Sequence, residues 1–327
     1  MNISFFFRKP SPTFHSIEEQ FFMMQKELPE LIKYENKFAK YQSKGLFKRI
    51  FITIQAAFNQ GDINHITGDI HFVALFLKKK KTILTVHDIG SVLNKPGIKG
   101  KILRFFWFTM PFKRVKYITV ISEFTKKEIL QTFKVNPDKI VVIPDCVSPQ
   151  ISFSDYEFNT KQPNILQIGT KQNKNLECII SAIKDTPCKL TILGKLSEKQ
   201  TALLEKNTIR FENQFNLDYP GVLDLYKKAD MLVFASTYEG FGVPVLEAQA
   251  TGRPVITSNI SPMKEVAGEG ALLVDPYSID DIRNGIQQII SDPELRQSLI
   301  RKGRENLKNY SAKAVAEKYY ELYKKTL

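Results

Sequence analysis

The most constraining stretch of this sequence is an apolar run that leads through a glycine turn into a short helical pattern. Residues Met231 to Ala235 are typical of a buried parallel strand. The turn contains Gly240 and Gly242, and Pro244 then opens an apolar helical pattern that ends at Gly252. Proline suits the first helical position, and glycine lets the backbone approach a ligand closely. A strand, a tight turn and a helix in this order predict a βαβ unit of an α/β fold.

The same turn is the first candidate site. Ligands of open parallel sheets bind at the carboxyl ends of strands, and the free N–H groups at a helix start favour an anion such as a diphosphate. Two glutamates flank the turn, Glu239 in the loop and Glu247 in the helix. On spacing alone, a tight turn with two surface carboxylates is an equally good interpretation, because a G-x-G pattern is weak evidence.

The whole chain predicts two α/β domains. A length of 327 residues suits two domains of ordinary size. Short β-rich runs alternate with helical patterns in both halves, as in parallel sheets built from βαβ units. We expect a first domain at 1–150, a polar linker at 151–163, a second domain at 164–309 and a terminal helix at 310–327.

The expected elements follow from periodicity. In the first half we expect a helix over 16–42, interrupted near Pro29, and strands at Ile3–Phe7, Ile50–Ala57, Ile63–Thr67, Thr82–Val86, Tyr117–Ile121 and Ile140–Ile143. In the second half we expect strands at Asn164–Ile168, Lys189–Leu193, Thr208–Phe211, Met231–Ala235, Pro254–Ser258 and Ala271–Val274. Helices are expected near 175–184, 197–206, 220–229, 244–251, 279–290, 293–307 and 311–325. The apolar run at 3–7 is too short for a signal peptide or a membrane span.

Charge is distributed unevenly along the chain. The net charge is +13, and residues 1–150 contain 24 Lys and Arg against 12 Asp and Glu. Such asymmetry predicts an anionic partner for the first half. Basic residues concentrate at 44–51, 78–81 and 99–117, and the last stretch interleaves them with aromatic residues. We expect an anionic membrane surface as the partner of an interfacial helix here. A partly buried helix with core aromatics is the main alternative, and nucleic acid the least favoured one, because no binding-module signature is present.

The segment 229–275 resembles the family-four retaining glycosyltransferases (glycosyltransferase group 1) of the GT-B fold. The resemblance rests on two glutamates separated by seven residues, Glu239 and Glu247, with E-G-F-G-x-P between them. The runs G-R-P-V-I-T-S and E-V-A-G-E-G-A-L-L-V-D-P fit the same pattern, and weaker matches are ILQIGT, ITVISEFTKKEI and TVHD. The resemblance implies two Rossmann-like parallel-sheet domains that face a cleft. It further implies that the first binds the acceptor, the second binds a nucleoside-diphosphate sugar, and the C-terminal helix crosses back to the first domain.

The resemblance also implies roles for individual residues. Glu247 would bond the nucleotide ribose, Glu239 would lie by the transferred sugar, and His87 would be the cleft histidine. Lys174 matches the phosphate-binding lysine, and Lys171 would substitute for an arginine that the family usually offers and that this chain lacks there. Backbone groups of the donor site are expected at Gly169, Phe241, Gly242 and Val243. The plain alternatives are solvated loop lysines and a hydrogen-bonded histidine at a strand end. The loop Arg8–Phe14 lacks the family's glycine-rich turn, and Arg8 or Lys9 there would approach an anionic acceptor or remain solvated.

Transfer of a sugar leaves negative charge on the departing diphosphate, so the site needs fixed positive groups. No D-x-D pattern occurs, so we expect no metal cofactor.

The resemblance implies transfer with retention to a glycan or lipid-linked acceptor in envelope polysaccharide synthesis. Three scattered cysteines predict a reducing compartment, and we expect a cytoplasmic enzyme, peripheral on the inner face of the plasma membrane. The alternatives are a nucleotide-sugar epimerase of GT-B form and a non-catalytic nucleotide-sugar or anion-binding protein.

Overall fold

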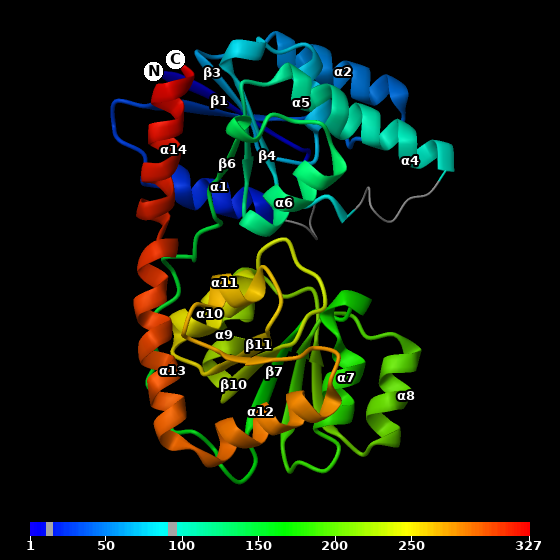
Figure 1. The fold of residues 1–327 in the computed structure, drawn as a ribbon, viewed down its shortest axis with the longest axis vertical. Coiled ribbons are helices and arrows are strands. Elements are labelled where there is room, and N and C mark those ends of the chain that lie inside the picture. Colours follow the sequence, from blue (N-terminus) through cyan, green and yellow to red (C-terminus); the bar gives the residue numbers. More distant parts are fainter. Residues whose placement is uncertain (11–15, 91–96) are drawn as a thin grey trace. The chain divides into compact units, whose positions relative to one another are not determined.

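The computed structural model describes residues 1–10, 16–90 and 97–327. The chain forms two compact units, one made of Met1–Cys146 with Ala312–Leu327 and the other of Val147–Ser311. Each unit is built around a six-stranded parallel sheet with helices packed against it (Figure 1). The expected fold class, an α/β fold with two parallel sheets, is confirmed. None of the described helices is both long enough and apolar enough to cross a membrane.

The first sheet has the strand order β2-β1-β3-β4-β5-β6. Its strands are β1 (Asn2–Phe7), β2 (Lys33–Phe38), β3 (Ile63–Ile66), β4 (Thr82–Val86), β5 (Tyr117–Val120) and β6 (Ile140–Val142). The expected strands β1 and β3 to β6 are confirmed within a residue. The chain runs from β1 to β2 on one side and then returns to β3 on the other side of β1. The topological switch point of this sheet therefore lies between β1 and β3.

The helices of the first unit correct two expectations. They are α1 (Ser16–Lys26), α2 (Leu46–Ala57), α4 (Gly97–Arg104), α5 (Met110–Arg114) and α6 (Glu123–Thr132), with a π-helical segment η3 (Phe105–Thr109) and short 3-10 turns that include η1 (His71–Leu75). The helix expected over 16–42 ends at Lys26, because Pro29 disfavours a helical residue before it. The strand expected at Ile50–Ala57 is part of helix α2. Its β-branched residues favour a strand, but the buried positions Ile52, Thr53 and Ala56 recur at helical spacing.

The last helix, α14 (Ala312–Thr326), belongs to the first unit. It buries an apolar stripe against β1 and α1 that includes Val315, Tyr319 and Tyr323. The ring of Phe21 lies 5.9 Å from that of Tyr319, and the ring of Phe5 lies 6.3 Å from that of Tyr323. Offset and edge-on aromatic pairs of this kind add to the free energy of burial. The chain's last segment thus completes the core of the domain with which the chain begins.

The second sheet has the order β12-β11-β10-β7-β8-β9. Its strands are β7 (Asn164–Ile168), β8 (Lys189–Leu193), β9 (Arg210–Gln214), β10 (Met231–Phe234), β11 (Val255–Ser258) and β12 (Leu272–Val274). Only β9 lies away from its expected position at Thr208–Phe211. The chain turns from β7 to β8 and β9 on one side, and β10 to β12 follow on the other side. Its switch point therefore lies between β7 and β10.

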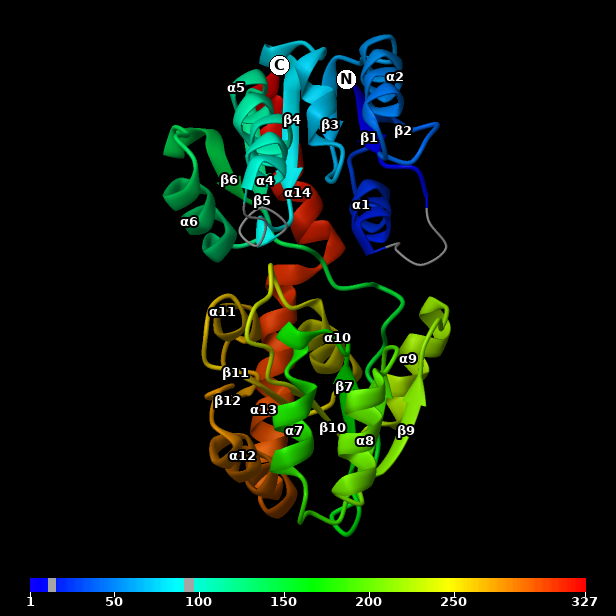
Figure 2. The same cartoon turned by 90° about the vertical axis from the view of Figure 1, so that its right-hand side faces the viewer.

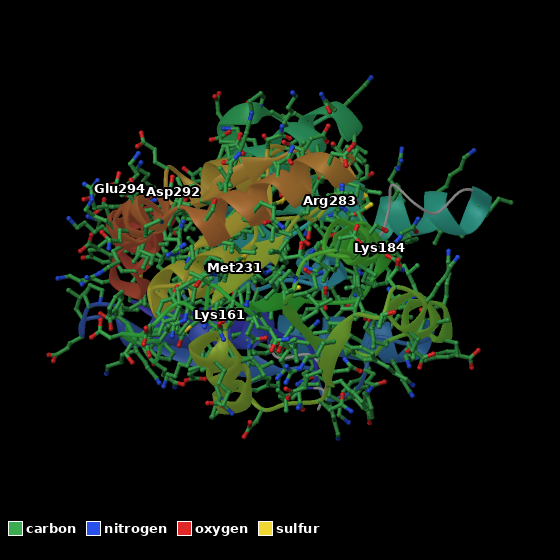
Figure 3. All side chains as sticks on the ribbon, turned by 90° about the horizontal axis from the view of Figure 1, so that it is seen from below. Lys161, Lys184, Met231, Arg283, Asp292 and Glu294 are labelled. Carbon is green, nitrogen blue, oxygen red and sulfur yellow. The ribbon has the colours of Figure 1, made fainter. Side chains whose placement is uncertain are left out.

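The helices of the second unit are close to expectation. They are α7 (Leu176–Ala182), α8 (Glu198–Lys206), α9 (Tyr219–Lys228), α10 (Val243–Thr251), α11 (Met263–Ala267), α12 (Ile279–Ser291) and α13 (Pro293–Asn306). The Ser278 hydroxyl accepts a hydrogen bond from the Asp281 N–H at 3.1 Å, as a helix cap does. Figure 3 labels Met231, the first residue of β10, and Asp292 with Glu294, which lie together where α12 passes into α13. Residues 151–163 form no helix or strand, and the Asn159 N–H bonds the Asp230 carboxylate of the second unit at 2.9 Å.

Candidate functional site

Two loops leave the second sheet at its switch point. Strands β7 and β10 are hydrogen-bonded neighbours, so the loops 169–175 and 235–242 start side by side at their carboxyl ends. The Asn173 carbonyl accepts from the Thr237 N–H at 2.9 Å, and the Asn173 side chain donates to the Tyr238 carbonyl at 2.8 Å. The Asn175 amide donates to the Ala235 carbonyl at 2.9 Å. Three hydrogen bonds therefore fix one loop against the other.

An ion pair joins the two loops. The Lys174 Nζ lies 2.7 Å from Glu239 Oε1, and the two side chains are 19% and 14% exposed. The same ammonium lies 4.6 Å from the centre of the Phe234 ring, a cation–π contact. A partly buried pair of this kind is stronger than a surface pair, because less water screens it. The two residues predicted to bind phosphate and to face the sugar thus contact each other at the switch point.

Gly169 is required for the position of Lys174. Its φ is +90°, and a Cβ atom at this residue would lie 2.8 Å from Lys174 Cγ. The lysine stem therefore crosses directly over the place where any other side chain would begin. Only glycine combines this backbone conformation with that space. The predicted role of Gly169 in the turn thus has a geometric basis, which is to let Lys174 reach Glu239.

Helix α10 begins at Val243, four residues after Glu239, and Gly242 is its N-cap with φ +124°. No side chain caps this helix start, and Pro244 lies within its first two positions. The first N–H groups and the positive end of the helix dipole are therefore available to an anion. The Phe241 side chain is buried and packs on Tyr310, with 5.8 Å between ring centres. Phe241 can therefore serve a ligand only through its backbone.

Glu247 is separated from Glu239 by the first turn of α10 and has its own partners. Tyr226 donates to Oε2 at 2.7 Å and Tyr219 donates to Oε1 at 3.3 Å. Burial raises the pKa of Glu247 to about 7, while the two tyrosine hydrogen bonds lower it. The carboxyl group therefore titrates near neutral pH, which is typical of functional sites. Sequence reasoning missed both tyrosines, because nothing in their spacing relates them to α10.

Lys171 is the one lysine of the first loop that the structure leaves at the surface. Its side chain is exposed, three residues before Lys174. The structure does not bring it into the pair with Glu239. Sequence reasoning also missed Asn173, although it lies directly before Lys174. An asparagine there resembles any loop residue until its two hydrogen bonds to the second loop are known.

The switch point of the first sheet also holds an ion cluster. Arg8 follows β1 and pairs with Asp69, which follows β3. The Arg8 Nε also lies 2.8 Å from Glu18 Oε1, and the Glu18 side chain is only 4% exposed. Arg8 therefore pairs with two carboxylates of its own unit, which leaves it poorly suited to bind an anionic acceptor. The expected loop residues 11–14 lie outside the described part of the chain.

His87 follows β4 in the first unit. Its Nε2 lies 2.9 Å from the Thr67 carbonyl, so the ring donates from Nε2, and Nδ1 is the acceptor of the neutral form. Gly68 has φ +144°, and a Cβ atom there would lie 3.0 Å from the His87 ring. Burial raises the pKa of Asp145, an effect that the charge of His87 opposes. His87 is half-buried and fixed by a strand-end hydrogen bond.

The two other described histidines in this part of the chain have structural partners. His65 bonds the Tyr323 hydroxyl and the Thr85 hydroxyl, each at 2.8 Å, and burial lowers its pKa to about 3. His71 bonds the Trp107 carbonyl at 2.8 Å, and burial lowers its pKa to about 4. Over residues 1–10, 16–90 and 97–327, no group of three His, Cys, Asp or Glu residues is placed to hold a metal ion.

Two family models match the chain. The model described as glycosyl transferases group 1 matches residues 150–306, and that described as Glycosyltransferase Family 4 matches residues 14–151. The chain is 30% identical over 229 residues to the O-antigen chain mannosyltransferase RfbU of Salmonella typhimurium, covering 67% of this chain and 63% of that protein. It is 29% identical over 256 residues to the O-antigen chain mannosyltransferase B of Escherichia coli, covering 71% and 67%.

A solved structure extends the likeness to the full chain. Anabaena HepE, determined in complex with UDP and glucose, superposes with a TM-score of 0.81 at 12% identity, covering 99% of this chain and 100% of that one. Identity this low supports the fold alone. The two family models together span every strand of both sheets except β1, and they include the switch-point loops of the second sheet. The chain belongs to the glycosyltransferases of group 1 and is a GT-B glycosyltransferase.

Proposed function

We propose that this glycosyltransferase transfers a sugar from a nucleoside-diphosphate sugar, with retention, to a glycan or lipid-linked acceptor of an envelope polysaccharide. The observation that carries the proposal is the Lys174–Glu239 pair at the switch point, next to the uncapped start of α10. Its O-antigen mannosyltransferase relatives favour a mannose donor. The complex of HepE with UDP and glucose makes UDP-glucose the second donor to test.

The donor would exchange partners with the ion pair. In its absence, Lys174 and Glu239 neutralise each other at 2.7 Å. A diphosphate next to Lys174 would take over the ammonium, and the Glu239 carboxylate would then face the sugar ring. The N–H groups of Gly242 and Val243 and the dipole of α10 would add positive potential for the phosphates. Fixed protein groups would therefore supply the positive charge that some other transferases take from a metal ion.

The bond changes follow from this arrangement. The C1–O bond to the phosphate breaks, and its electron pair stays on the phosphate oxygen near Lys174. Positive charge then develops on the sugar ring, where the Glu239 carboxylate stabilises it. The acceptor oxygen bonds C1, and its proton passes to an oxygen of the departing phosphate. Glu247, four residues into α10, would accept hydrogen bonds from the ribose hydroxyls, since an ionised carboxylate accepts two.

His87 belongs to the first unit, which we propose binds the acceptor. Its Nδ1 would accept a hydrogen bond from a sugar hydroxyl, because Nε2 donates to the Thr67 carbonyl. The retaining outcome does not require a protein base for that proton. His87 would therefore orient a sugar hydroxyl. The working location would be the cytoplasmic face of the plasma membrane, where donor nucleotides and lipid-linked acceptors meet.

Incubation of the purified protein with UDP-glucose and with nucleoside-diphosphate mannoses, together with a bacterial lipid extract, tests the proposal. We expect release of the nucleoside diphosphate and a glycosylated lipid, with the donor's anomeric configuration kept in NMR spectra of the product. Glu239→Ala and Glu247→Ala should each lose most of the turnover. Full turnover in both variants would contradict the site. Donor binding without turnover indicates a non-catalytic protein, and conversion of the donor sugar without acceptor indicates an epimerase.

A further inference from the structure

Helix α2 of the first unit is apolar on two opposite sides. The side toward the core carries Ile52, Thr53 and Ala56. The opposite side carries large apolar residues at spacings of four, three and four, namely Phe47, Phe51, Ile54 and the C-cap Phe58. Such spacings place side chains on one helix face. Phe47 is 87% exposed and Phe58 is 86% exposed. A helix that is apolar outside as well as inside has an outer face fit for a partner.

Exposed apolar side chains also occur on neighbouring elements of this unit. On α4 and η3 these are Ile102, Phe105 and Phe106, which are all about half exposed. The Arg49 guanidinium of α2 lies 4.5 Å from the centre of the Trp107 ring of η3, so the two helical segments touch. Figure 1 shows α2, α4 and α5 along one side of this unit, and Figure 2 looks onto that side. We call this the α2–α4 surface.

The charge of the α2–α4 surface has one sign. The stretches 36–61, 70–87 and 89–122, from which its residues come, contain no Asp or Glu. Exposed basic side chains border the apolar ones, namely Lys44, Lys48, Lys101 and Arg104. Apolar residues flanked by lysine and arginine are the composition of helices that lie in the headgroup region of an anionic bilayer. Two copies of this surface would repel each other, because both are basic.

We propose that the α2–α4 surface docks on an anionic phospholipid bilayer, with α2 as its main inserted element. The side chains of Phe47 and Phe58 enter the apolar region below the headgroups, and Lys44 and Lys48 bond phosphates. Sequence reasoning located an interfacial helix at 99–117 and read residues 50–57 as a strand, so α2 was not among its candidates. Isoleucines on this surface, such as Ile54 and Ile102, favour lipid over nucleic acid, since they offer no ring on which a base could stack.

The inference rests on the proposed function only for the nature of the acceptor. A bilayer-bound unit meets a lipid-linked acceptor by diffusion in two dimensions. Vesicle binding does not require donor, acceptor or turnover. If the wild-type protein binds UDP-glucose but does not bind anionic vesicles, the docking surface is overturned and the proposed function still stands.

Trp107 reports on the surface directly, because it is the only tryptophan of the chain and lies against Arg49. The full-length protein is titrated with vesicles of phosphatidylcholine and with vesicles that also contain phosphatidylglycerol. We expect a blue shift of the tryptophan emission and co-flotation with the anionic vesicles. Added salt should weaken the binding, because it screens the lysines and arginines. Part of it should persist, because the phenylalanines insert without charge.

Three variants separate the contribution of the aromatic side chains to vesicle binding from that of the lysines. The double variant Phe47→Ser/Phe58→Ser should bind anionic vesicles at least about tenfold more weakly, as loss of one buried aromatic side chain already predicts. Lys44→Gln/Lys48→Gln should weaken binding at low salt and leave less salt dependence. Phe215→Ser is the matched control, since Phe215 is 51% exposed in the second unit. It should bind as the wild type does.

Several results would overturn the inference. These are no vesicle binding at low salt, equal binding by Phe47→Ser/Phe58→Ser, or equal loss in Phe215→Ser. Tight binding of single-stranded RNA with no vesicle binding would assign the surface to nucleic acid. If the protein forms a dimer in the absence of vesicles and Phe47→Ser/Phe58→Ser makes it monomeric, the α2–α4 surface binds a second copy of the chain.

Discussion

The two sheets of this protein have corresponding switch points, and both are bridged by an ion pair built in the same way. In the first unit the cation, Arg8, follows the first strand, and the carboxylate, Asp69, follows the strand that crosses to the other side. In the second unit Lys174 and Glu239 have the corresponding positions. The shared topology thus brings a cation and a carboxylate together at the switch point of each sheet.

The surroundings of the two pairs differ. Arg8 meets a second carboxylate, Glu18, so the first cluster carries one negative charge in excess. Lys174 meets one carboxylate, and the uncapped start of α10 adds positive potential nearby. The switch point of the second sheet therefore favours binding of a diphosphate, and the switch point of the first sheet disfavours it. This difference, rather than the fold, is our reason for proposing that the donor binds to the second unit.

The largest expected effect is a loss of turnover when the cation of the second ion pair is removed. Lys174→Ala should lower turnover about 100-fold or more, because it removes the cation from the leaving phosphate. Lys171→Ala is the matched control, since its side chain is exposed in the same loop. It should keep turnover within a few-fold of wild type. Initial rates with a saturating nucleotide sugar measure both, and equal losses in the two variants would refute the distinction between these lysines.

The corresponding change in the first unit should act on stability. Arg8→Gln leaves the carboxylate of Glu18, which is 4% exposed, without its cation. Loss of one partner of a largely buried pair destabilises a protein by about 3 kcal/mol. Denaturant unfolding should report this cost, while the dissociation constant for the donor stays unchanged in the folded protein. Weaker donor binding with unchanged stability would mean that the first switch point also takes part in donor binding.

A pair of glycine variants refines the role of the second switch point. Gly169→Ala and Gly45→Ala both place a Cβ on a backbone with positive φ, +90° and +83°, a strain of about 1–2 kcal/mol. A Cβ at Gly169 would clash with the Lys174 side chain, whereas nothing lies within 4 Å of a Cβ at Gly45. Both variants should unfold more easily, but only Gly169→Ala should also weaken donor binding, as calorimetry would detect. Equal donor affinity in both would show that the path of Lys174 is not essential.

Much of this architecture could be predicted from the sequence, because buried parallel strands leave continuous apolar runs. Strand β10 and the start of α10 are of this kind. Strand β2 was missed, since an edge strand with the sequence KYENKF has the polarity of a loop or a helix surface. Helix α2 was misread because its residues are apolar on both faces, which hides the helical period. The site residues followed from the family motif, but their pairing did not, since Lys174 and Glu239 are 65 residues apart.

The tyrosine partners of Glu247 provide the finest test of the second unit, through pH. With a pKa of about 7, Glu247 is mostly ionised above that pH and mostly protonated below it. Since a protonated carboxyl can accept fewer bonds from ribose hydroxyls, donor affinity should fall with the ionised fraction, to roughly a tenth at pH 6. A nucleotide sugar is the suitable probe, because its diphosphate does not titrate in this range. Glu247→Gln should bind weakly at every pH tested.

Tyr226→Phe then shifts the same curve in a predictable direction. The Tyr226 hydrogen bond lowers the pKa of Glu247, because it stabilises the ionised carboxylate. Its removal should raise that pKa further and move the midpoint of donor binding to higher pH, with little change at the alkaline plateau. A purely structural role for Tyr226 would weaken binding equally at all pH values. A midpoint that stays in place would therefore show that the Tyr226 hydrogen bond does not control the ionisation of Glu247.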